Sequence, residues 1–317
     1  MPWFPTLSEI ESAAERIAPW AHRTPVMTSS AIDAIAGCTL FFKCENFQKV
    51  GAFKFRGASN AVLSLTPEEA ACGVATHSSG NHAQALALAA KLRGIPAHIV
   101  MPSNAPTIKK AAVAGYGAHI VECEPTLEAR ETTLDEVVRR TGAAFVHPYN
   151  DQRVIAGQAT AARELIADIP DLDILMTPVG GGGLLSGSAM SAHYLAPATV
   201  VIAAEPAGAD DAQRSFRAGY IIPSEHPNTI ADGLLTSLGD RTFTIIREHV
   251  HDIVTVPDDA IIRAMRLVWE RMKIIIEPSA AVPLAAILEH RIESDGKRAG
   301  IILSGGNLDL DRLPWMP

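Results

Sequence analysis

The chain has 317 residues, which is longer than a single hydrophobic core usually reaches, so we expect two lobes. Its composition, 48% hydrophobic and 20% charged, is that of a globular protein and excludes a disordered or fibrous one. The net charge of -8, without any basic run, argues against nucleic acid as a partner.

The first residues lack the basic and apolar regions of a secretory signal, and no apolar stretch reaches membrane-spanning length. We therefore expect a cytoplasmic protein with no membrane partner. Cys38, Cys44, Cys72 and Cys123 are scattered, without the spacing of a zinc site or a disulfide framework. We expect them to be reduced and mostly buried.

Short apolar runs rich in β-branched residues alternate with longer helical patterns along most of the chain. The predicted strands are residues 73–76, 97–101, 118–121, 174–177, 200–204 and 300–303. Helix formers lie between them, as at residues 83–93 and 127–140, and Thr66-Pro67-Glu68-Glu69 has the pattern of a capping box. This alternation favours an α/β fold with parallel sheets covered by helices. Residues 146–151 are predicted to join two lobes.

Lys54 lies in the string Gly51-Ala52-Phe53-Lys54-Phe55-Arg56-Gly57, which suggests an amine held between two aromatic rings. A partly desolvated setting lowers the pKa of a lysine and favours the neutral amine that Schiff-base chemistry requires. The alternative is a lysine at the start of an amphipathic helix, reaching past two core phenylalanines to water.

Ser78-Ser79-Gly80-Asn81-His82 follows a predicted strand and precedes an alanine-rich helix. Ligands bind at such strand ends in open α/β sheets, and the hydroxyls, amide and free N–H groups of this turn are suited to a carboxylate. The alternative is that a serine or asparagine here only caps the helix.

Gly180, Gly181, Gly182 and Gly183 stand between a predicted strand and a helix. Four successive glycines lose much backbone entropy on folding, and their use is close approach of several N–H groups to an anion, for which we expect a phosphate. The run lacks the ending of a nucleotide P-loop and the spacing of a dinucleotide fingerprint. A flexible turn is the alternative.

Ser304-Gly305-Gly306-Asn307 follows a third strand end. A lysine, a carboxylate-binding turn, a phosphate loop and a lone serine together describe pyridoxal phosphate with an amino-acid substrate. These motifs, in this order, resemble the fold-type II pyridoxal-phosphate enzymes of the serine/threonine dehydratase and serine racemase branch, over nearly the whole chain. Further matching segments are Glu205-Pro206, Ile230-Ala231-Asp232-Gly233, Trp269-Glu270-Arg271-Met272-Lys273 and Glu277-Pro278.

The resemblance implies a tryptophan synthase β-like fold of two open, twisted, mainly parallel sheets with flanking helices. It further implies a large cofactor-binding domain of residues 1–66 and 151–317 and a small mobile domain of residues 67–150. The implied cofactor contacts are the Schiff base of Lys54, the ring face of Phe53, the 3'-oxygen contact of Asn81, the phosphate contacts of Gly180 to Gly183 and the ring-nitrogen contact of Ser304.

A neutral hydroxyl at Ser304 cannot form an ion pair with a protonated ring nitrogen, which favours β-elimination over transamination. The implied activity is therefore an ammonia-lyase that removes water from a 3-hydroxy amino acid and yields a keto acid and ammonia. Lys54 or Ser79 would remove the α-proton. Because Ser79 matches the second base of the racemases, a serine or aspartate racemase is the alternative, and a non-catalytic protein that binds the cofactor or a metabolite is a remote one.

The expected substrate depends on three positions at which this sequence differs from the racemases. The racemases carry Thr, Ser and Gly where this chain has Val50, Ala52 and Ala83. The apolar residues here are more similar to those of 3-hydroxyaspartate dehydratases, so 3-hydroxyaspartate is favoured over serine or threonine. Arg130 resembles an arginine that reaches the active site and pairs with a second carboxylate. Its alternative is a surface arginine. The other implied substrate contacts are Ser78, Ser79, Asn81 and His82.

Glu205, the backbone of Ala209 and Asp211 match the divalent-cation site of the racemase-like members, where magnesium, calcium or manganese would bind. An acidic turn with helix capping is the alternative. A homodimer is the habit of the family. Regulation by ATP is a further possibility, since six positions fall where some racemases bind that nucleotide: Gln84, Lys109, Lys110, Tyr116, Glu277 and Asn307.

Overall fold

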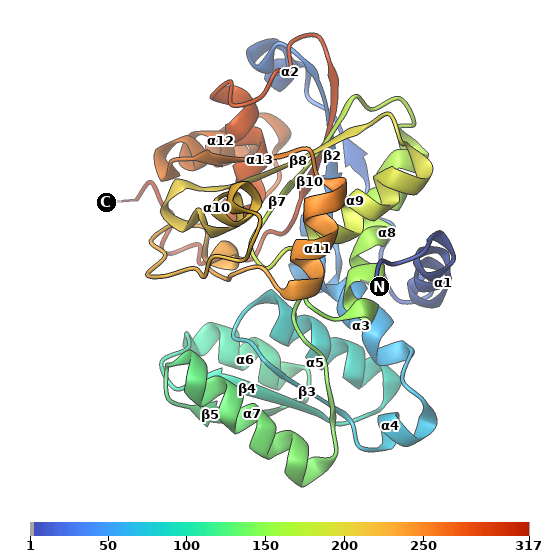
Figure 1. The fold of residues 1–317 in the computed structure, drawn as a ribbon. Coiled ribbons are helices and arrows are strands. Elements are labelled where there is room, and N and C mark those ends of the chain that lie inside the picture. The colour runs from blue at the N-terminus through green and yellow to red at the C-terminus, as the bar shows by residue number, and fades with distance from the viewer. Residues whose placement is uncertain (1–2, 317) are drawn as a thin grey trace.

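The computed structural model describes residues 3–316, without the side chain of Ile108, and contains two sheets (Figure 1). The six-stranded sheet has the order β1-β2-β10-β7-β8-β9, and the four-stranded sheet has the order β5-β4-β3-β6. Neighbouring strands are parallel except for β1, which is antiparallel to β2. The strands are β1 (Val26–Met27), β2 (Thr39–Cys44), β3 (Val74–His77), β4 (Ala97–Pro102), β5 (His119–Cys123), β6 (Ala144–Phe145), β7 (Ile174–Pro178), β8 (Val200–Pro206), β9 (Asp252–Val256) and β10 (Arg298–Leu303).

Helices cover both faces of the six-stranded sheet, and a third core joins the smaller sheet to α3 and α5. The α-helices are α1 (Leu7–Ile17), α2 (Ser30–Ala36), α3 (Lys54–Leu63), α4 (Pro67–Ala71), α5 (Asn81–Arg93), α6 (Thr107–Gly115), α7 (Leu127–Thr141), α8 (Gln152–Asp168), α9 (Gly183–Leu195), α10 (Asp211–Ala218), α11 (Asp240–His249), α12 (Asp258–Met272) and α13 (Pro278–Leu288). Four 3-10 turns complete the elements of the described residues: η1 (Glu45–Phe47), η2 (Lys49–Gly51), η3 (Ala207–Ala209) and η4 (Asp232–Leu234).

The predicted α/β alternation is confirmed, because all six predicted strands are present as β3, β4, β5, β7, β8 and β10. The sequence signals predicted to start or end helices are present in the structure. Thr66 accepts a hydrogen bond from the N–H of Glu69 at 3.2 Å and donates its own N–H to the Glu69 carboxylate at 2.8 Å, which starts α4. Gly94 and Gly142 end α5 and α7 with φ of 74° and 71°, a conformation that favours glycine.

Three helices of the larger lobe pack with their backbones almost in contact. A Cβ added to Gly157 of α8 would lie 2.6 Å from the Cα of Gly57 in α3. On the next helix, a Cβ on Gly187 of α9 would lie 2.6 Å from the backbone nitrogen of Ala159 in α8. Glycine at these positions is therefore a packing requirement that sets the spacing of α3, α8 and α9.

The four-stranded sheet lies within residues 67–150, and α3 packs between α5 and α8, where the two lobes of Figure 1 meet. Separate motion of the two lobes stays a prediction. None of the described helices is long and apolar enough to cross a membrane. The four cysteines are free. Cys72 is exposed, because it caps the short surface helix α4, so the expectation of burial was wrong for this thiol.

Candidate active site

The start of α3 lies beside the end of β10, at the carboxyl edge of the six-stranded sheet. Ser304 follows β10 directly and is buried. Its carbonyl accepts a hydrogen bond from the N–H of Phe53 at 3.0 Å, and an isolated bridge pairs Ala52 with Gly305. These backbone bonds bring Lys54, the first residue of α3, to the serine-containing loop.

Lys54 is half-buried and its amine faces the junction between the lobes. The Nζ atom donates a hydrogen bond to the carbonyl of Pro148 at 2.9 Å. Burial lowers the pKa of Lys54 from 10.5 to about 8, although the nearby negative charge of Glu277 opposes this change. The lowered pKa increases the neutral fraction of the amine near neutral pH, and the neutral form is the one that acts as a nucleophile.

The expectation that Lys54 lies between two aromatic rings was wrong for one ring. Its Nζ lies 5.2 Å from the centroid of the Phe53 ring. Phe55 is fully buried in the core around α3 and α5, and the amine over its ring is that of Lys49, at 5.6 Å. The two phenylalanines differ because successive helical residues point about 100° apart, which sends Phe55 away from the amine.

Gly180 to Gly183 connect β7 to the thirteen-residue helix α9. A Cβ on Gly181 would lie 2.3 Å from the ring of Tyr149, and Gly182 has φ of 88°, so both positions need glycine. Among the described residues, none accepts a hydrogen bond from the N–H groups of residues 180–182. These N–H groups, at the positive end of a helix, fit a phosphate.

Asn81 is fixed by a hydrogen-bond network that sequence analysis did not predict. Its Nδ2 donates to both carboxylate oxygens of Glu277, at 3.1 and 3.2 Å, and its Oδ1 accepts from Asn307 Nδ2 at 2.9 Å. Asn307 Nδ2 also donates to the carbonyl of Val50 at 2.6 Å. Val50 has φ of 56°, a strained conformation for a β-branched residue, and this bond helps to hold it.

Glu277 is itself buried, and burial raises its pKa to about 7, against the effect of the hydrogen bond from Asn81. The sequence marked this residue only as part of the matching pair Glu277-Pro278 and as one of the six nucleotide positions, and did not indicate its contact with Asn81, which lies 196 positions away. Tyr149 and the carbonyl of Pro148 were missed as contacts for the same reason, although residues 146–151 were predicted to join the lobes.

The turn after β3 does not cap α5 with a side chain. Gly80 is the N-cap residue and makes no side-chain capping bond, so the capping alternative is wrong for Ser78, Ser79 and Asn81. The hydroxyl of Ser78 accepts a hydrogen bond from the N–H of Gly80 at 3.3 Å, while Ser79 is half-buried. The turn therefore combines hydroxyls with the N-terminus of a helix, which suits a carboxylate.

His82 is buried beneath this turn. Its Nε2 lies 3.2 Å from the carbonyl of Val146, and its Nδ1 has no partner among the described residues. Burial, followed by the charge of Lys54, lowers the pKa of His82 well below its usual value. A neutral ring bonded to Val146 links α5 to the segment that joins the lobes.

Arg130 lies in the first turns of α7, where its Nε donates to the carbonyl of Thr126 at 3.3 Å. Burial, followed by the positive charge of Arg130, lowers the pKa of His77, the last residue of β3. Within residues 3–316, Arg130 forms no salt bridge. The guanidinium can therefore pair with an added carboxylate.

Glu205 and Asp211 form a buried acidic pair, 1% and 2% exposed. The Glu205 carboxylate accepts hydrogen bonds from the N–H groups of Ala212 and Gln213, at 3.2 and 2.6 Å, while Asp211 Oδ2 has no partner among the described residues. Burial raises the pKa of Glu205 to about 9 and that of Asp211 to about 6. An unpartnered oxygen and two acids fit a divalent cation, with the Ala209 carbonyl as a further oxygen ligand.

This arrangement contains only two acidic side chains. The described part of the chain has no cluster of three or more His, Cys, Asp or Glu side chains suited to a metal, so such a site depends on backbone oxygen and water.

The six positions that resemble a nucleotide site do not form one exposed group. Glu277 is 4% exposed and belongs to the Asn81 network. Lys109 and Lys110 form salt bridges with Asp232 and Glu122, at 2.8 and 2.6 Å. The first of these joins α6 to η4 and so connects the two lobes.

The sequence profile of a family described as "pyridoxal-phosphate dependent enzyme" matches residues 17–305. The chain is 54% identical over 313 residues to the β-hydroxyaspartate dehydratase of Paracoccus denitrificans, covering 99% of each chain. It is 48% identical over 309 residues to the L-threo-3-hydroxyaspartate ammonia-lyase of Saccharomyces cerevisiae, covering 97% of this chain and 95% of the relative. The crystal structure of the serine racemase of Dictyostelium discoideum superposes with a TM-score of 0.93 at 51% identity, covering 96% and 99% of the two chains.

Proposed function

The chain belongs to the pyridoxal-phosphate dependent enzymes of fold-type II, and on this premise we propose that it removes water from 3-hydroxyaspartate to give a keto acid and ammonia. Serine and threonine are the other candidate substrates. The observation that carries the proposal is the half-buried amine of Lys54, with its lowered pKa, on the same sheet edge as a glycine loop with free N–H groups. The identity to two relatives that are named for hydroxyaspartate supports the choice of substrate.

The residues of this chain fit the cofactor, and its N–H groups at Gly180 to Gly183 would bind the phosphate. Asn81, held by Glu277, would donate to the ring's 3'-oxygen, Ser304 would face the ring nitrogen and Phe53 would lie on the ring face. Lys54 would bind the aldehyde carbon. When bound, pyridoxal phosphate supplies an electron sink for the substrate's α-carbon.

Binding of the substrate is assigned to the small lobe. Ser78, Ser79, Asn81 and His82 surround the N-terminus of α5, where the α-carboxylate would accept N–H and O–H hydrogen bonds. Arg130, which has no salt-bridge partner in residues 3–316, would pair with the second carboxylate that distinguishes hydroxyaspartate from serine.

Lys54 is the residue assigned to accept the α-proton, because an amine with a pKa of about 8 exchanges protons readily near neutral pH. The Cβ–O bond then breaks, and the protonated Lys54 amine would return this proton to the departing hydroxyl, which leaves as water. The remaining enamine rearranges to an imine, and its hydrolysis gives the keto acid and ammonia.

A serine or aspartate racemase is the second candidate, and the half-buried hydroxyl of Ser79 favours it as a second proton-transfer group. A non-catalytic protein that binds the cofactor is the remote candidate. Retention of Lys54, Asn81, Ser304 and the glycine loop in one place argues against this candidate.

We further propose that Glu205, Asp211 and Ala209 bind a divalent cation. We also propose that the protein is a homodimer, which light scattering of the purified protein tests. Two observations argue against nucleotide regulation: Glu277 is buried, and Lys109 and Lys110 are already in salt bridges.

The decisive experiment is a substrate panel with three readouts. Serine, threonine and the diastereomers of 3-hydroxyaspartate are incubated with the purified protein, and keto acid, ammonia and enantiomer ratios of serine and aspartate are measured. Keto acid and ammonia from one hydroxyaspartate diastereomer support the proposal, and Lys54→Ala removes this activity. Enantiomer exchange without keto acid supports the racemase, and the absence of both supports a binding protein.

Arg130→Met tests the substrate assignment, with exposed Arg139→Met in the same helix as the matched control. Loss of a charge-assisted contact of about 1.5–3 kcal/mol lowers kcat/KM for hydroxyaspartate by about 10- to 150-fold. Serine turnover stays unchanged, because serine has no second carboxylate. An equal fall for both substrates contradicts this role of Arg130.

A further inference from the structure

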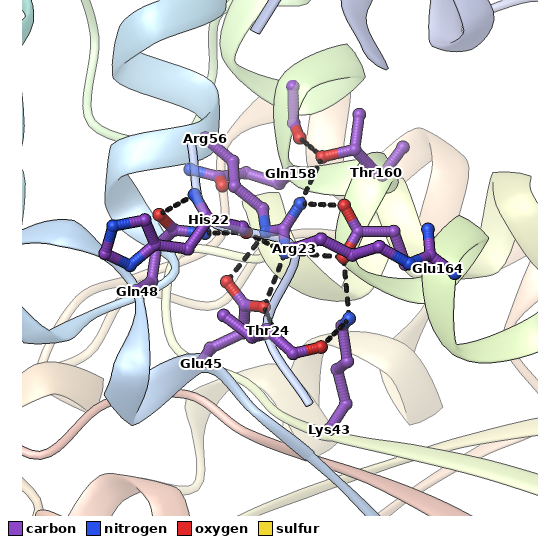
Figure 2. Close-up of polar contacts among 12 residues, drawn as sticks. His22, Arg23, Thr24, Lys43, Glu45, Gln48, Arg56, Gln158, Thr160 and Glu164 are labelled. Atoms are coloured by element: carbon purple, nitrogen blue, oxygen red, sulfur yellow. Dashed lines mark hydrogen bonds and ion pairs between the residues drawn. The ribbon is translucent and has the colours of Figure 1, made fainter. Parts of the chain in front are cut away.

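A buried ionic network surrounds Arg56, two residues after Lys54 in α3 (Figure 2). Its charged members are Arg56, Lys43, Glu45 and Glu164, which we call the Arg56 network. The side chains of Arg56, Lys43 and Glu45 are fully buried, and that of Glu164 is 14% exposed. Two cations and two carboxylates make the group neutral overall. This network has no part in the proposed chemistry.

All three nitrogen atoms of the Arg56 guanidinium donate hydrogen bonds. Its Nε and Nη2 donate to the two oxygens of Glu45, at 2.7 and 2.8 Å, in a bidentate pair. Its Nη1 and Nη2 donate to the two oxygens of Glu164, at 2.8 and 2.9 Å, in a second bidentate pair. Nη1 also lies 3.3 Å from the hydroxyl of Thr160. Two such pairs fix both the position and the plane of the group.

The other members connect the network to neighbouring segments. Lys43 Nζ donates to Glu164 at 2.6 Å and to the carbonyl of Thr24 at 2.7 Å. The Thr24 hydroxyl donates to Glu45 at 2.5 Å. Four separate pieces of chain therefore meet in the Arg56 network: the segment before β1, the end of β2 with η1, α3 and α8.

The charge state of Glu164 fits this geometry. Burial alone would raise its pKa, but hydrogen bonds and positive charge from Arg56, with a contribution from Lys43, outweigh burial and lower it. The Glu164 carboxylate is therefore ionised at neutral pH, and the loss of its charge would leave the buried guanidinium of Arg56 with one carboxylate fewer.

The start of α3 needs such an anchor. Phe53, its N-cap residue, makes no side-chain capping bond, so local sequence does not fix where the helix begins. The bridge from Ala52 to Gly305 holds the chain on one side of Lys54. On the other side, Arg56 holds the helix by its side chain, and the Gly57–Gly157 contact holds it by its backbone.

Buried ion pairs are weak sources of stability, and apolar residues of similar volume often replace them without loss. An apolar side chain cannot fix an orientation by hydrogen bonds, whereas two bidentate pairs allow only one orientation of the guanidinium. Lysine retains the charge of arginine but lacks the planar fork. The presence of arginine here therefore indicates a requirement for orientation rather than for charge or burial.

We propose that Arg56 is a positioning residue for Lys54: its two bidentate pairs, to Glu45 in η1 and to Glu164 in α8, set the rotation and position of α3 so that the Lys54 amine reaches the aldehyde of the cofactor. This inference rests on the proposed cofactor chemistry at Lys54.

The test compares Arg56→Lys with Arg263→Lys. Arg263 also forms salt bridges with two carboxylates, those of Asp259 and Glu289, but its side chain is 56% exposed and it lies in α12. Cofactor-free proteins are titrated with pyridoxal phosphate, and the Kd is obtained from the visible absorbance of the lysine-bound form. After borohydride reduction, peptide mapping gives the fraction of cofactor attached to Lys54, and thermal unfolding gives the Tm.

We expect Arg56→Lys to be folded at the assay temperature with a lower Tm, and to bind pyridoxal phosphate roughly 10- to 100-fold more weakly, with reduced labelling of Lys54, because small displacements of a reacting group have effects of this size. Arg263→Lys should match the wild type. A folded Arg56→Lys protein with wild-type Kd and wild-type labelling overturns the inference and leaves the proposed function intact. A wild type that is not labelled at Lys54 overturns both.

Glu164→Gln covers the case in which Arg56→Lys does not fold. It keeps the pair with Glu45 and removes the charge of the partly exposed carboxylate. Intermediate weakening of cofactor binding, at a Tm above the assay temperature, supports the positioning role. A lowered Tm with unchanged Kd and labelling shows a role in stability alone and overturns the inference.

Discussion

Replacing Lys54 with methionine should stabilise the cofactor-free protein at neutral pH, because folding places this amine where its charge is disfavoured. Burial lowers the pKa of Lys54 from 10.5 to about 8. At about 1.4 kcal/mol for each pKa unit, holding the charged amine in the folded state costs about 3 kcal/mol, as an upper value for a half-buried side chain. Methionine has a similar length and carries no charge, so it removes this cost.

The stability advantage of Lys54→Met over the wild type must decrease as pH rises. Well below pH 8 the amine is charged in both the folded and the unfolded protein, and the full cost applies. Between pH 8 and 10.5 the folded protein releases the proton first, so the wild type becomes more stable as pH rises. The advantage of Lys54→Met should therefore shrink by about 2 kcal/mol between pH 7.5 and pH 9.5.

Urea unfolding of the wild type and Lys54→Met at these two pH values, both free of cofactor, measures this difference. Lys297→Met, at an exposed turn position, is the control for the general effect of losing a lysine. An advantage of Lys54→Met that is equal at both pH values, or that grows with pH, would refute the argument that the site destabilises the charged amine.

Two further results are expected. Magnesium or calcium at 100 times its Kd should stabilise the folded wild type by about 2.7 kcal/mol and so raise its Tm. In differential scanning fluorimetry, Glu205→Gln or Asp211→Asn should remove this rise in Tm. An equal rise in the variants contradicts the cation site. Gly181→Ala should abolish cofactor binding, because its Cβ would lie 2.3 Å from the ring of Tyr149, and adding Tyr149→Ala should restore part of the binding in an absorbance titration. Failure of the double variant to recover would assign the defect to the loop alone.

The sequence predicted the parallel α/β layers well, because apolar β-branched runs of the central strands are a direct signal. It missed β2, where Lys43 stands inside an otherwise apolar strand and is buried only because Glu164 neutralises it from α8. It also missed β9 and the two-residue strands β1 and β6, which are too short or too polar at their ends for a clear pattern. A buried charge pair between distant segments cannot be read from local periodicity.

The candidate site was predictable where a residue type alone restricts the chemistry, as for Lys54 and the four glycines. Its supporting contacts were not, because Pro148 and Glu277 meet Lys54 and Asn81 across 94 and 196 positions. The role of Phe55 was misjudged for a simpler reason, since helical geometry separates neighbours that adjoin in the sequence.

The close backbone packing of α3, α8 and α9 bears on how this scaffold changes its chemistry. Lys54 opens α3 and the glycine loop opens α9, while α8 lies between them at near-minimal distance through Gly157 and Gly187. The span between the Lys54 amine and the glycine loop is thus set by main-chain contact, and substitutions in the turn after β3 or in α7 leave that span untouched. Substitutions can therefore change the substrate and the reaction outcome while the spacing of Lys54 and the glycine loop stays constant. This is consistent with racemases and dehydratases sharing one architecture.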